Sequence, residues 1–428
     1  MKDKIVVGLD IGTTKICVVV AKKDEFGKIQ ILGVGKAKSE GVSRAAVVNI
    51  NKTVDAITKA VEQAEQLSGI RIKGVNVGIS GEHVQCIKSN AEITINPSGI
   101  VREDDVRRFV DKAKNNLINL INLEREIIHS IPQEFIIDDQ EGVIDPIGMV
   151  GQTMKGAVYV VVGMKNKIRN IEQCIEKAGL VINGMTFEPI ASGLAVLKES
   201  EKKSGVAIID IGGGTSDIAI YTKGVIRHSE VIKLAAFDVT NDIAYGLKTL
   251  DYVAEDLKIK YGFAYSRDLI RDEEIHVQSI EGRAPKMFMR SQLTNIIEAR
   301  LIEIFEHSVK VLKKSDYYDY LNAGAILTGG GSMIDGTQAL AQEILGMDVR
   351  IGKPEGISGG MLGEINSPIY ATAVGLVLRA LEEIEQNPIR AENSLLSEER
   401  AATEVPKEIP KENDNSLVNR LKNWFDQI

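Results

Sequence analysis

Two stretches of the chain, almost two hundred residues apart, repeat one pattern of apolar and polar positions. Each has an apolar run, a glycine-rich turn preceded by an aspartate, and a second apolar run: VVGLDIGTTKICVVV at residues 6–20 and VAIIDIGGGTSDIAIY at residues 206–221. Short runs rich in Val and Ile on both sides of a glycine turn are typical of two β-strands joined as a hairpin. The pattern therefore predicts two β-hairpins of the same kind.

The residue types in the two turns suit the phosphates of a nucleotide. Glycines let backbone N–H groups converge on an anion, Thr and Ser hydroxyls add donors, and an aspartate can hold hydrated Mg2+. We expect Asp10 and Asp210 to hold Mg2+ through water. The other expected contacts are Gly12, Thr13, Thr14 and Lys15 in the first turn and Gly212, Gly213, Gly214 and Thr215 in the second. Two facing hairpins would hold one nucleotide from both sides.

A third glycine run follows a short apolar strand at residues 325–328. It consists of Gly329, Gly330 and Gly331, and Ser332 is then expected to cap a helix over residues 333–345. A helix N-terminus beside bare backbone suits the sugar and phosphates of a nucleotide. Neither a GxxxxGK[ST] motif nor a strand-linked GxGxxG occurs in the sequence, so the P-loop and Rossmann folds are excluded.

These three motifs resemble the actin, sugar-kinase and heat-shock-chaperone ATPase superfamily, which implies a two-lobed α/β fold that binds ATP. Under this resemblance the first phosphate, second phosphate and adenosine motifs are residues 10–15, 210–217 and 327–332.

The resemblance extends to two connecting helices, at residues 188–193 and 367–375. Small residues such as Ala191 and Gly375 would let these helices cross closely. In chaperone-like relatives a connecting-helix Glu followed by Pro orients the attacking water. The resemblance therefore makes Glu188 the candidate residue for positioning water.

Between the two hairpins the chain carries a segment about the size of a small α+β subdomain. Its pattern predicts strands at residues 91–95, 134–138 and 157–164 and an amphipathic helix at 103–122. An insertion at this place, joined to the sequences SGEH at residues 80–83 and DPIG at residues 145–148, resembles the bacterial cell-division FtsA family. The resemblance implies these divisions: subdomain 1A at 1–82 with 164–202 and 367–381, inserted subdomain 1C at 83–163, subdomain 2A at 203–237 with 312–366, and subdomain 2B at 238–311.

The same resemblance assigns roles in the second lobe. Glu255 and Lys258 align with residues that contact the nucleoside in relatives, while a solvated i,i+3 ion pair is the alternative. Arg300, in a helix predicted at residues 291–312, is a candidate contact for the C-terminal peptide of the tubulin-like division protein FtsZ. A surface salt bridge is the alternative for Arg300. The family likeness also implies self-association into filaments and contacts of later division proteins with the inserted subdomain.

The C-terminal region has a different pattern. Residues 382–415 lose hydrophobic periodicity and are rich in Glu, Asn, Pro and Lys, which predicts a flexible tether. Residues 416–428 then predict a short amphipathic helix whose apolar side chains fall within about 120° of arc: Leu417, Val418, Leu421, Trp424, Phe425 and Ile428. Arg420 and Lys422 lie on its two rims, where their charges can reach lipid headgroups. We expect this helix to bind the inner membrane; packing on its own globular body is the alternative.

Composition agrees with a multidomain protein that acts inside the cell. A chain of 428 residues is too long for one ordinary core, and a formal net charge of −8 argues against nucleic acid as the main partner. Three widely spaced cysteines fit reduced thiols better than disulfides or a metal site. No stretch approaches the ~20 apolar residues of a membrane span, so we expect a peripheral protein.

Together these features predict an ATP-binding, self-associating adaptor that ties FtsZ filaments of the division ring to the cytoplasmic face of the cell membrane at the septum. We expect at most slow ATP turnover. A small-molecule kinase of the same fold is one alternative, but the sequence offers no evident general base for an acceptor. A pilus-assembly adaptor like PilM is another, which the terminal helix and the DPIG element disfavour.

Overall fold

The chain divides into two units, residues 1–386 and residues 387–428. A computed structural model describes residues 4–24, 27–118, 124–277, 286–358 and 361–386. The predicted membrane helix and nearly all of the predicted tether lie outside these residues. Within the described part of the chain, no helix is both long and apolar enough to cross a bilayer.

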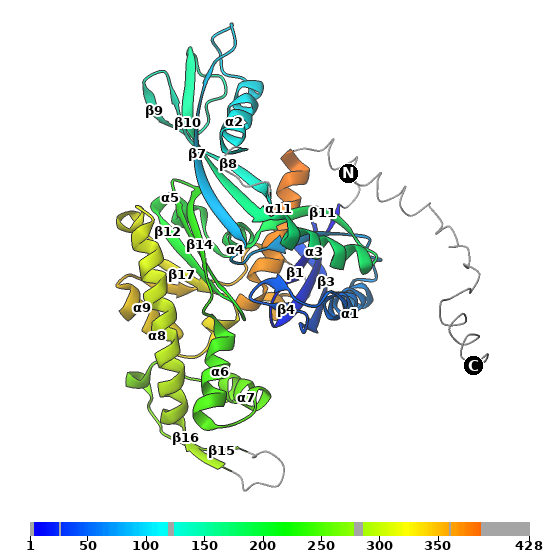
Figure 1. Ribbon diagram of the computed structural model, residues 1–428, viewed down its shortest axis with the longest axis vertical. Coiled ribbons are helices and arrows are strands. Elements are labelled where there is room, and N and C mark those ends of the chain that lie inside the picture. Colours follow the sequence, from blue (N-terminus) through cyan, green and yellow to red (C-terminus); the bar gives the residue numbers. More distant parts are fainter. Residues whose placement is uncertain (1–3, 25–26, 119–123, 278–285, 359–360, 387–428) are drawn as a thin grey trace, which may run out of the picture. The chain divides into compact units, whose positions relative to one another are not determined.

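The two large sheets have the same arrangement of strands (Figure 1). Their strand orders are β11-β6-β1-β2-β3-β19 and β14-β13-β12-β17-β18, and in each an antiparallel three-stranded meander adjoins parallel strands. The predicted hairpins are β1–β2 and β12–β13, as the repeated sequence indicated. The first sheet contains β1 (Ile5–Ile11), β2 (Lys15–Lys23), β3 (Ile29–Lys38), β6 (Gly74–Ile79), β11 (Val181–Phe187) and β19 (Ile357–Ser358). The second contains β12 (Val206–Ile211), β13 (Ser216–Thr222), β14 (Val225–Ile232), β17 (Ala325–Thr328) and β18 (Val349–Ile351).

The two predicted connecting helices are α4 (Glu188–Val196) and α11 (Ala371–Gln386), and they pack against each other. A Cβ added to Gly375 would lie 1.8 Å from the carbonyl oxygen of Ala191. Since no side chain fits at that distance, the close crossing depends on glycine at this position. The sequence prediction of a close helix crossing is confirmed.

Helix α11 is longer than the sequence predicted, because it continues through residues 382–386 where the tether was expected to begin. Apolar periodicity fades in this stretch, but Arg379 pairs with Glu382 at 3.6 Å and with Glu383 at 3.0 Å, one turn further along the helix. Glu385 pairs with Lys23 of β2. Ion pairs at i,i+3 and i,i+4 stabilise a helix, and here they add to the packing of Ile384 against the core. A pattern of hydrophobic positions does not include such ion pairs.

Helices cover the sheets and extend the second lobe (Figure 1). In the first lobe α1 (Ile50–Ser68) packs on β2 and β3, and α3 (Lys165–Lys177) packs on α1. The helix predicted at residues 291–312 is α8 (Arg290–Lys314), which packs against α6 and α9. The remaining elements of the second lobe are α5 (Glu199–Ser204), α6 (Ala236–Leu247), α7 (Asp251–Tyr261), β15 (Glu274–Val277), β16 (Lys286–Met289) and α9 (Thr337–Leu345).

The segment between the hairpins forms its own four-stranded sheet, in the order β7-β10-β8-β9, with one helix packed on it. Phe109 and Phe135 meet at its centre, with ring centroids 5.3 Å apart, among buried Val and Ile side chains. The strands are longer than predicted: the added parts, residues 84–90, 125–133 and 153–156, mix polar and apolar side chains without regular alternation. The elements are β7 (Val84–Thr94), α2 (Glu103–Ile118), β8 (Arg125–Ile137), β9 (Gln140–Val143) and β10 (Thr153–Met164).

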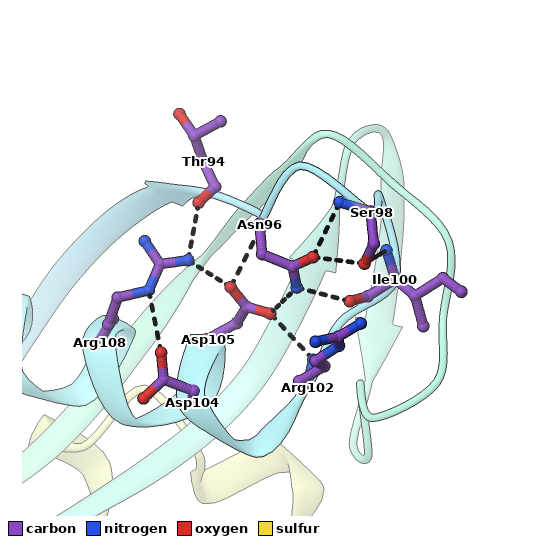
Figure 2. Close-up of polar contacts among 8 residues, drawn as sticks. All are labelled: Thr94, Asn96, Ser98, Ile100, Arg102, Asp104, Asp105 and Arg108. Carbon is purple, nitrogen blue, oxygen red and sulfur yellow. Dashed lines mark hydrogen bonds and ion pairs between the residues drawn. The ribbon is translucent and has the colours of Figure 1, made fainter.

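A buried carboxylate organises the loop that precedes α2. The Asp105 side chain is 1% exposed, and it accepts hydrogen bonds from the backbone N–H of Arg102 at 2.9 Å and of Asn96 at 3.1 Å. Figure 2 shows that the Asn96 amide and the Arg108 guanidinium also donate to it. The bond to Arg102 is one half of a capping box, because it satisfies a free N–H at the helix start.

Three donors of α2 cover the outer edge of strand β7. Arg108, Lys112 and Asn116 are spaced by four along the helix. They donate to the backbone carbonyls of residues 94, 92 and 90, at 3.2, 2.7 and 3.0 Å. One helical turn advances by about 5.4 Å and two strand residues by about 6.6 Å. The two spacings match, so this side-chain ladder follows the strand; Figure 2 includes its Arg108–Thr94 bond.

Replacing Asp105 by Ala should destabilise the inserted subdomain by about 2–4 kcal/mol, because four donors lose a buried acceptor. Asp104→Ala is the matched control: this carboxylate is 75% exposed and lies 3.8 Å from Arg108, so its loss should cost less than ~1 kcal/mol. Denaturant unfolding with hydrogen exchange of the α2 amides would measure both changes. Equal effects of the two substitutions would contradict this account of the loop.

Candidate functional site

The two hairpin turns close in the same way. In the first turn the N–H of Gly12 donates to the carbonyl of Lys15 at 3.0 Å, and in the second the N–H of Gly212 donates to the carbonyl of Thr215 at 3.0 Å. The preceding aspartates occupy corresponding strand positions, since Asp10 pairs with Cys17 and Asp210 with Asp217 across the hairpins. The repeated sequence thus produces a repeated local geometry.

The two turns face each other directly. A Cβ added to Gly213 would lie 2.5 Å from Cγ2 of Thr14, and one added to Gly214 would lie 2.5 Å from Oγ1 of Thr13. Any side chain at these glycines would therefore fill the space between the turns. The prediction that the hairpins face each other is confirmed, and the reason for glycine at both positions is this close approach.

Four carboxyl groups gather behind the turns: Asp10, Glu188, Asp210 and Asp217. Burial raises the pKa of the Asp10 carboxyl to about 6, Lys15 opposes the rise and Asp210 adds to it. Burial raises the pKa of Asp217 to about 7, and Asp210 and Asp10 add to that rise although a hydrogen bond opposes it. The pKa of Glu188 lies well above its ordinary value through burial and repulsion from the three aspartates. The site therefore favours bound protons or a bound cation.

Hydroxyl groups supply hydrogen bonds to two of these carboxyls. Ser192 on α4 donates to Oδ2 of Asp210 at 2.7 Å, and Thr372 on α11 lies 3.4 Å from the same oxygen. Ser80, directly after β6, donates to Oδ1 of Asp217 at 2.5 Å. Both aspartates belong to the second sheet, whereas Ser80 follows a strand of the first. These bonds therefore join the carboxyl cluster to the connecting helices and to the other sheet.

The sequence prediction missed these hydroxyls and the part played by Asp217. Ser192 lies four residues after Glu188, on the same helix face, and Thr372 lies within the second predicted connecting helix. Asp217 ends the quoted DIGGGTSD motif, and Ser80 begins the SGEH sequence. The residues were visible in the motifs. Their contacts were not, because each contact joins two different elements of the fold, 18 residues apart for Ser192 and Asp210 and more than a hundred apart for the contacts of Ser80 and Thr372.

Lys15 points toward the start of α11. Its Nζ donates to the carbonyl of Ile369 at 2.5 Å and lies 5.1 Å from the centre of the Tyr370 ring. The positive charge of Lys15 opposes the rise in the pKa of Asp10 and of Asp210. It therefore offsets part of the negative charge of the carboxyl cluster. The structure thus brings Lys15 into the cluster that the sequence assigned to the phosphates.

The third glycine turn adjoins the second hairpin, because β17 pairs in parallel with β12 and Thr328 lies beside Asp210. A Cβ on Gly329, whose φ is 79°, would lie 2.3 Å from Oδ1 of Asp210. Gly330 and Gly331 follow it in a short 3-10 helix. The adenosine motif predicted from the sequence therefore touches the second phosphate motif.

The predicted role of Ser332 as a helix cap is wrong. Ser332 lies inside the 3-10 helix Gly330–Met333, where its Oγ donates to the carbonyl of Gly329 at 2.8 Å. The α-helix starts later, at Thr337, because Asp335 pairs with the chain near Phe263 and Gly336 adopts a φ of 84°. This tertiary pairing interrupts a stretch whose composition suits a continuous helix.

Glu255 and Lys258 form an ion pair on α7, with 2.8 Å between Oε2 and Nζ. Lys258 is buried, and it also donates to Oγ1 of Thr240 at 2.8 Å and to the carbonyl of Ala236 at 3.0 Å. The backbone N–H of Ala236 in turn donates to the carbonyl of Gly212 in the second turn, at 3.0 Å. The pair is thus linked to the second glycine turn through its buried lysine, whereas the Glu255 side chain is 42% exposed. Burial lowers the pKa of Lys258, and Glu255 opposes that change.

Arg300 on α8 is half-buried and engaged in ion pairs. Its Nε lies 2.6 Å from Oδ2 of Asp242, its Nη2 lies 3.0 Å from Oδ1 of the same residue, and it also pairs with Glu303. The arrangement is the salt bridge that the sequence left open as the alternative. The predicted membrane residues, Leu417, Val418, Arg420, Leu421, Lys422, Trp424, Phe425 and Ile428, lie outside the described residues.

The fold is of the actin-like, two-lobed class. This class is defined by two sheets with the same strand arrangement, by glycine turns that face each other, and by helices that cross between the sheets. Solved structures with this fold include the PilM-PilN type IV pilus biogenesis complex, with a TM-score of 0.61, 17% identity and coverage of 87% of this chain and 98% of that one. MreB5 of Spiroplasma citri bound to ADP has a TM-score of 0.54 at 14% identity, covering 90% of this chain and 99% of that one. At these identities the likeness concerns the fold.

Relatives of higher identity give the family. Residues 207–375 match the family described as cell division protein FtsA, and residues 81–162 match the SHS2 domain inserted in FtsA. Cell division protein FtsA of Pseudomonas aeruginosa is 39% identical over 380 residues, 89% of this chain and 90% of that protein. The protein of the same name in Borreliella burgdorferi is 34% identical over 428 residues, 99% of both chains. The chain belongs to the FtsA family of cell division proteins.

The carboxyl cluster should make stability depend on pH in the absence of metal and nucleotide. Because the folded-state pKa of Asp217, about 7, exceeds its ordinary value of 3.8, its stabilising effect is full below pH 4 and is lost as pH rises through 7. The wild type should therefore lose stability relative to Asp217→Asn by on the order of 1–2 kcal/mol between pH 5 and pH 8. Thermal unfolding across this range measures the difference. Asp104→Asn, at an exposed position, is the control, and a constant gap between wild type and Asp217→Asn would contradict the prediction.

Proposed function

We propose that this protein is an ATP-binding adaptor that assembles into filaments and holds FtsZ filaments at the cytoplasmic face of the cell membrane during septum formation. The observation that carries the proposal is FtsA-family identity of 34–39% over 87% or more of the chain in several relatives, with the inserted domain in place. The filament proposal is also supported by the actin-like fold, since MamK of this fold is described as a double helical filament.

Nucleotide binding is supported by the site geometry. The facing turns place Thr13 opposite Gly214 and Thr14 opposite Gly213, and Lys15 and the third glycine turn lie beside the same carboxyls. In solved structures MreB5 of Spiroplasma citri carries ADP or AMPPNP. We propose that ATP occupies the corresponding place here, with its phosphates at the two turns and its nucleoside near Glu255, Lys258 and residues 329–332.

Mg2+ fits this site through water. Within the described residues no three His, Cys, Asp or Glu side chains converge closely enough to bind a metal directly. Asp210 is nevertheless near enough to Asp10 to contribute to the raised pKa of the Asp10 carboxyl. Two such carboxylates suit the hydration shell of Mg2+, which gives up its waters reluctantly. The ion would neutralise charge of the phosphates and of the carboxyl cluster.

Slow turnover of ATP follows from the state of Glu188. A carboxylate that positions or activates water has to be ionised, and the pKa of Glu188 lies well above its ordinary value. Burial and the three neighbouring aspartates therefore favour the protonated form of this carboxyl while the cluster is free of cations. Such a site suits a nucleotide that stabilises a conformation more than one that is consumed rapidly.

The second lobe offers a surface for the FtsZ peptide. Tyr245 on α6 and Tyr252 and Ile259 on α7 are 89%, 73% and 73% exposed, and exposed aromatic side chains are common anchors in peptide recognition. Arg300 is available to an acidic peptide residue only if its ion pair with Asp242 is displaced. We propose that the exposed aromatic side chains provide the main contact and that Arg300 has a secondary role.

Membrane attachment is assigned to residues 416–428 on the sequence alone. A single helix with six apolar residues binds a bilayer weakly and reversibly, whereas a filament that carries many copies binds firmly. Later division proteins are proposed to contact the inserted subdomain 1C. Septal localisation of the protein then requires both membrane binding and FtsZ binding.

Removal of the Asp210 carboxylate should abolish binding of Mg-ATP, by 100-fold or more, because Asp210 lies between the second and third turns. Isothermal titration of Asp210→Ala measures the loss, and circular dichroism shows whether the fold is intact. Asp348→Ala is the control, because Asp348 is exposed and lies directly before β18, outside the carboxyl cluster. Unchanged ATP affinity in a folded Asp210→Ala protein would refute the nucleotide site.

A charge in the apolar stripe of the terminal helix should release the protein from membranes. We expect Trp424→Glu to lower binding to anionic vesicles at least tenfold and to remove vesicle-bound FtsZ, while ATP affinity stays the same. Co-sedimentation with vesicles measures both proteins, and Asn423→Glu on the polar face is the control. Trp424 is the single tryptophan of the chain, so an emission maximum that vesicles do not shift would refute membrane insertion of this helix.

A further inference from the structure

A short segment connects the first sheet to the inserted subdomain. Residues 80–83, here called the root segment, follow β6 directly and precede β7. At its start Ser80 is 2% exposed and donates to Oδ1 of Asp217, which is 6% exposed, at 2.5 Å. Asp217 lies on β13, in the hairpin that carries the second of the two facing glycine turns. The chain therefore enters the inserted subdomain through a residue bonded to the carboxyl cluster.

The other end of the root segment is bonded to the inserted subdomain itself. The carbonyl of His83 accepts hydrogen bonds from the N–H of Met164 at 3.2 Å and from Nη1 of Arg125 at 3.4 Å. Met164 ends β10 and Arg125 begins β8. Four residues thus link Asp217 to the places where the two longest strands of the inserted sheet meet the first lobe.

A second contact holds the inserted sheet to the second lobe. The guanidinium of Arg227 on β14, 7% exposed, donates to Oε1 of Glu134 at 2.6 Å and to Oε1 of Gln133 at 3.1 Å. Strand β14 pairs with β13, which carries Asp217. A displacement of this strand pair relative to the first sheet must therefore move the inserted subdomain or break one of the two contacts.

We propose that Ser80 is a positioning residue of the nucleotide site, and that its bond to Asp217 transmits nucleotide occupancy to the inserted subdomain. This inference rests on the nucleotide binding proposed above. A hydrogen bond to a carboxylate is stronger than one between neutral groups, so its strength depends on the charges around Asp217. Phosphates and a cation at the turns change those charges, and the root segment carries the change to β8 and β10.

The test uses the full-length protein with ATP and MgCl2 and compares Ser80→Ala, Ser80→Thr and Ser89→Ala. Ser89 is the matched control, since it is 5% exposed and donates to the carbonyl of Ala113 at 2.8 Å within the inserted subdomain. Two quantities are measured: the affinity for Mg-ATP, and the change in hydrogen exchange of residues 84–94 and 153–164 when Mg-ATP saturates the protein.

Wild-type protein should exchange more slowly in both strands when Mg-ATP binds. Ser80→Ala should bind Mg-ATP about 5- to 10-fold more weakly and lose this slowing even at saturation. Ser80→Thr should restore both properties through its hydroxyl, and Ser89→Ala should keep both. If Ser80→Thr does not fold, Asp217→Asn replaces it. Its amide oxygen can still accept the bond, so a fraction of the slowing should remain.

The outcomes separate this inference from the proposed function. Wild-type protein that does not bind Mg-ATP would refute nucleotide binding itself. Wild-type protein that binds Mg-ATP without slower exchange in these strands would overturn the coupling alone. The coupling also fails if saturated Ser80→Ala shows the same slowing as wild type, or if Ser89→Ala loses it to the same extent.

Discussion

Burial of four carboxyl groups behind two facing glycine turns is the constraint on which the rest of the structure depends. Like charges at this distance cannot all be ionised in a buried place, and the raised pKa values of Asp10, Asp217 and Glu188 express that conflict. Donors on the connecting helices and from the opposite sheet reduce it. The hydrogen bonds that reduce this conflict are therefore also bonds that join the second sheet to the connecting helices and to the first sheet.

Features encoded within a short stretch of sequence were predictable. Each hairpin is formed by neighbouring residues, so its apolar runs, aspartate and glycines already specify strand, turn and strand. The close crossing of α4 and α11 followed from small residues at Ala191 and Gly375. The inserted sheet was located correctly because its segment is bounded by the two hairpins, although its strands proved longer than the alternation indicated.

Features that depend on distant contacts were not predictable in the same way. The role of Ser80 requires the first and second sheets to meet, and the start of α9 is set by pairing of Asp335 with a segment seventy residues earlier. The ion pair of Glu255 and Lys258 was recognised, but its burial against α6 was not. A prediction from hydrophobic positions also does not take ion pairs into account, and it therefore missed the last turn of α11. Apart from the local ion pairs of α11, the missing information was in each case the identity of a neighbour in space.

The ladder of donors along β7 has a consequence for assembly. An edge strand with free carbonyls is a template for another strand, and sheets that join in this way form contacts that are hard to undo. Arg108, Lys112 and Asn116 occupy those carbonyls in the folded subdomain. Association through this edge must then rely on side chains, whose contacts respond to salt and dissociate quickly. The side chains of α2 therefore protect this edge of the inserted sheet against backbone pairing with another sheet.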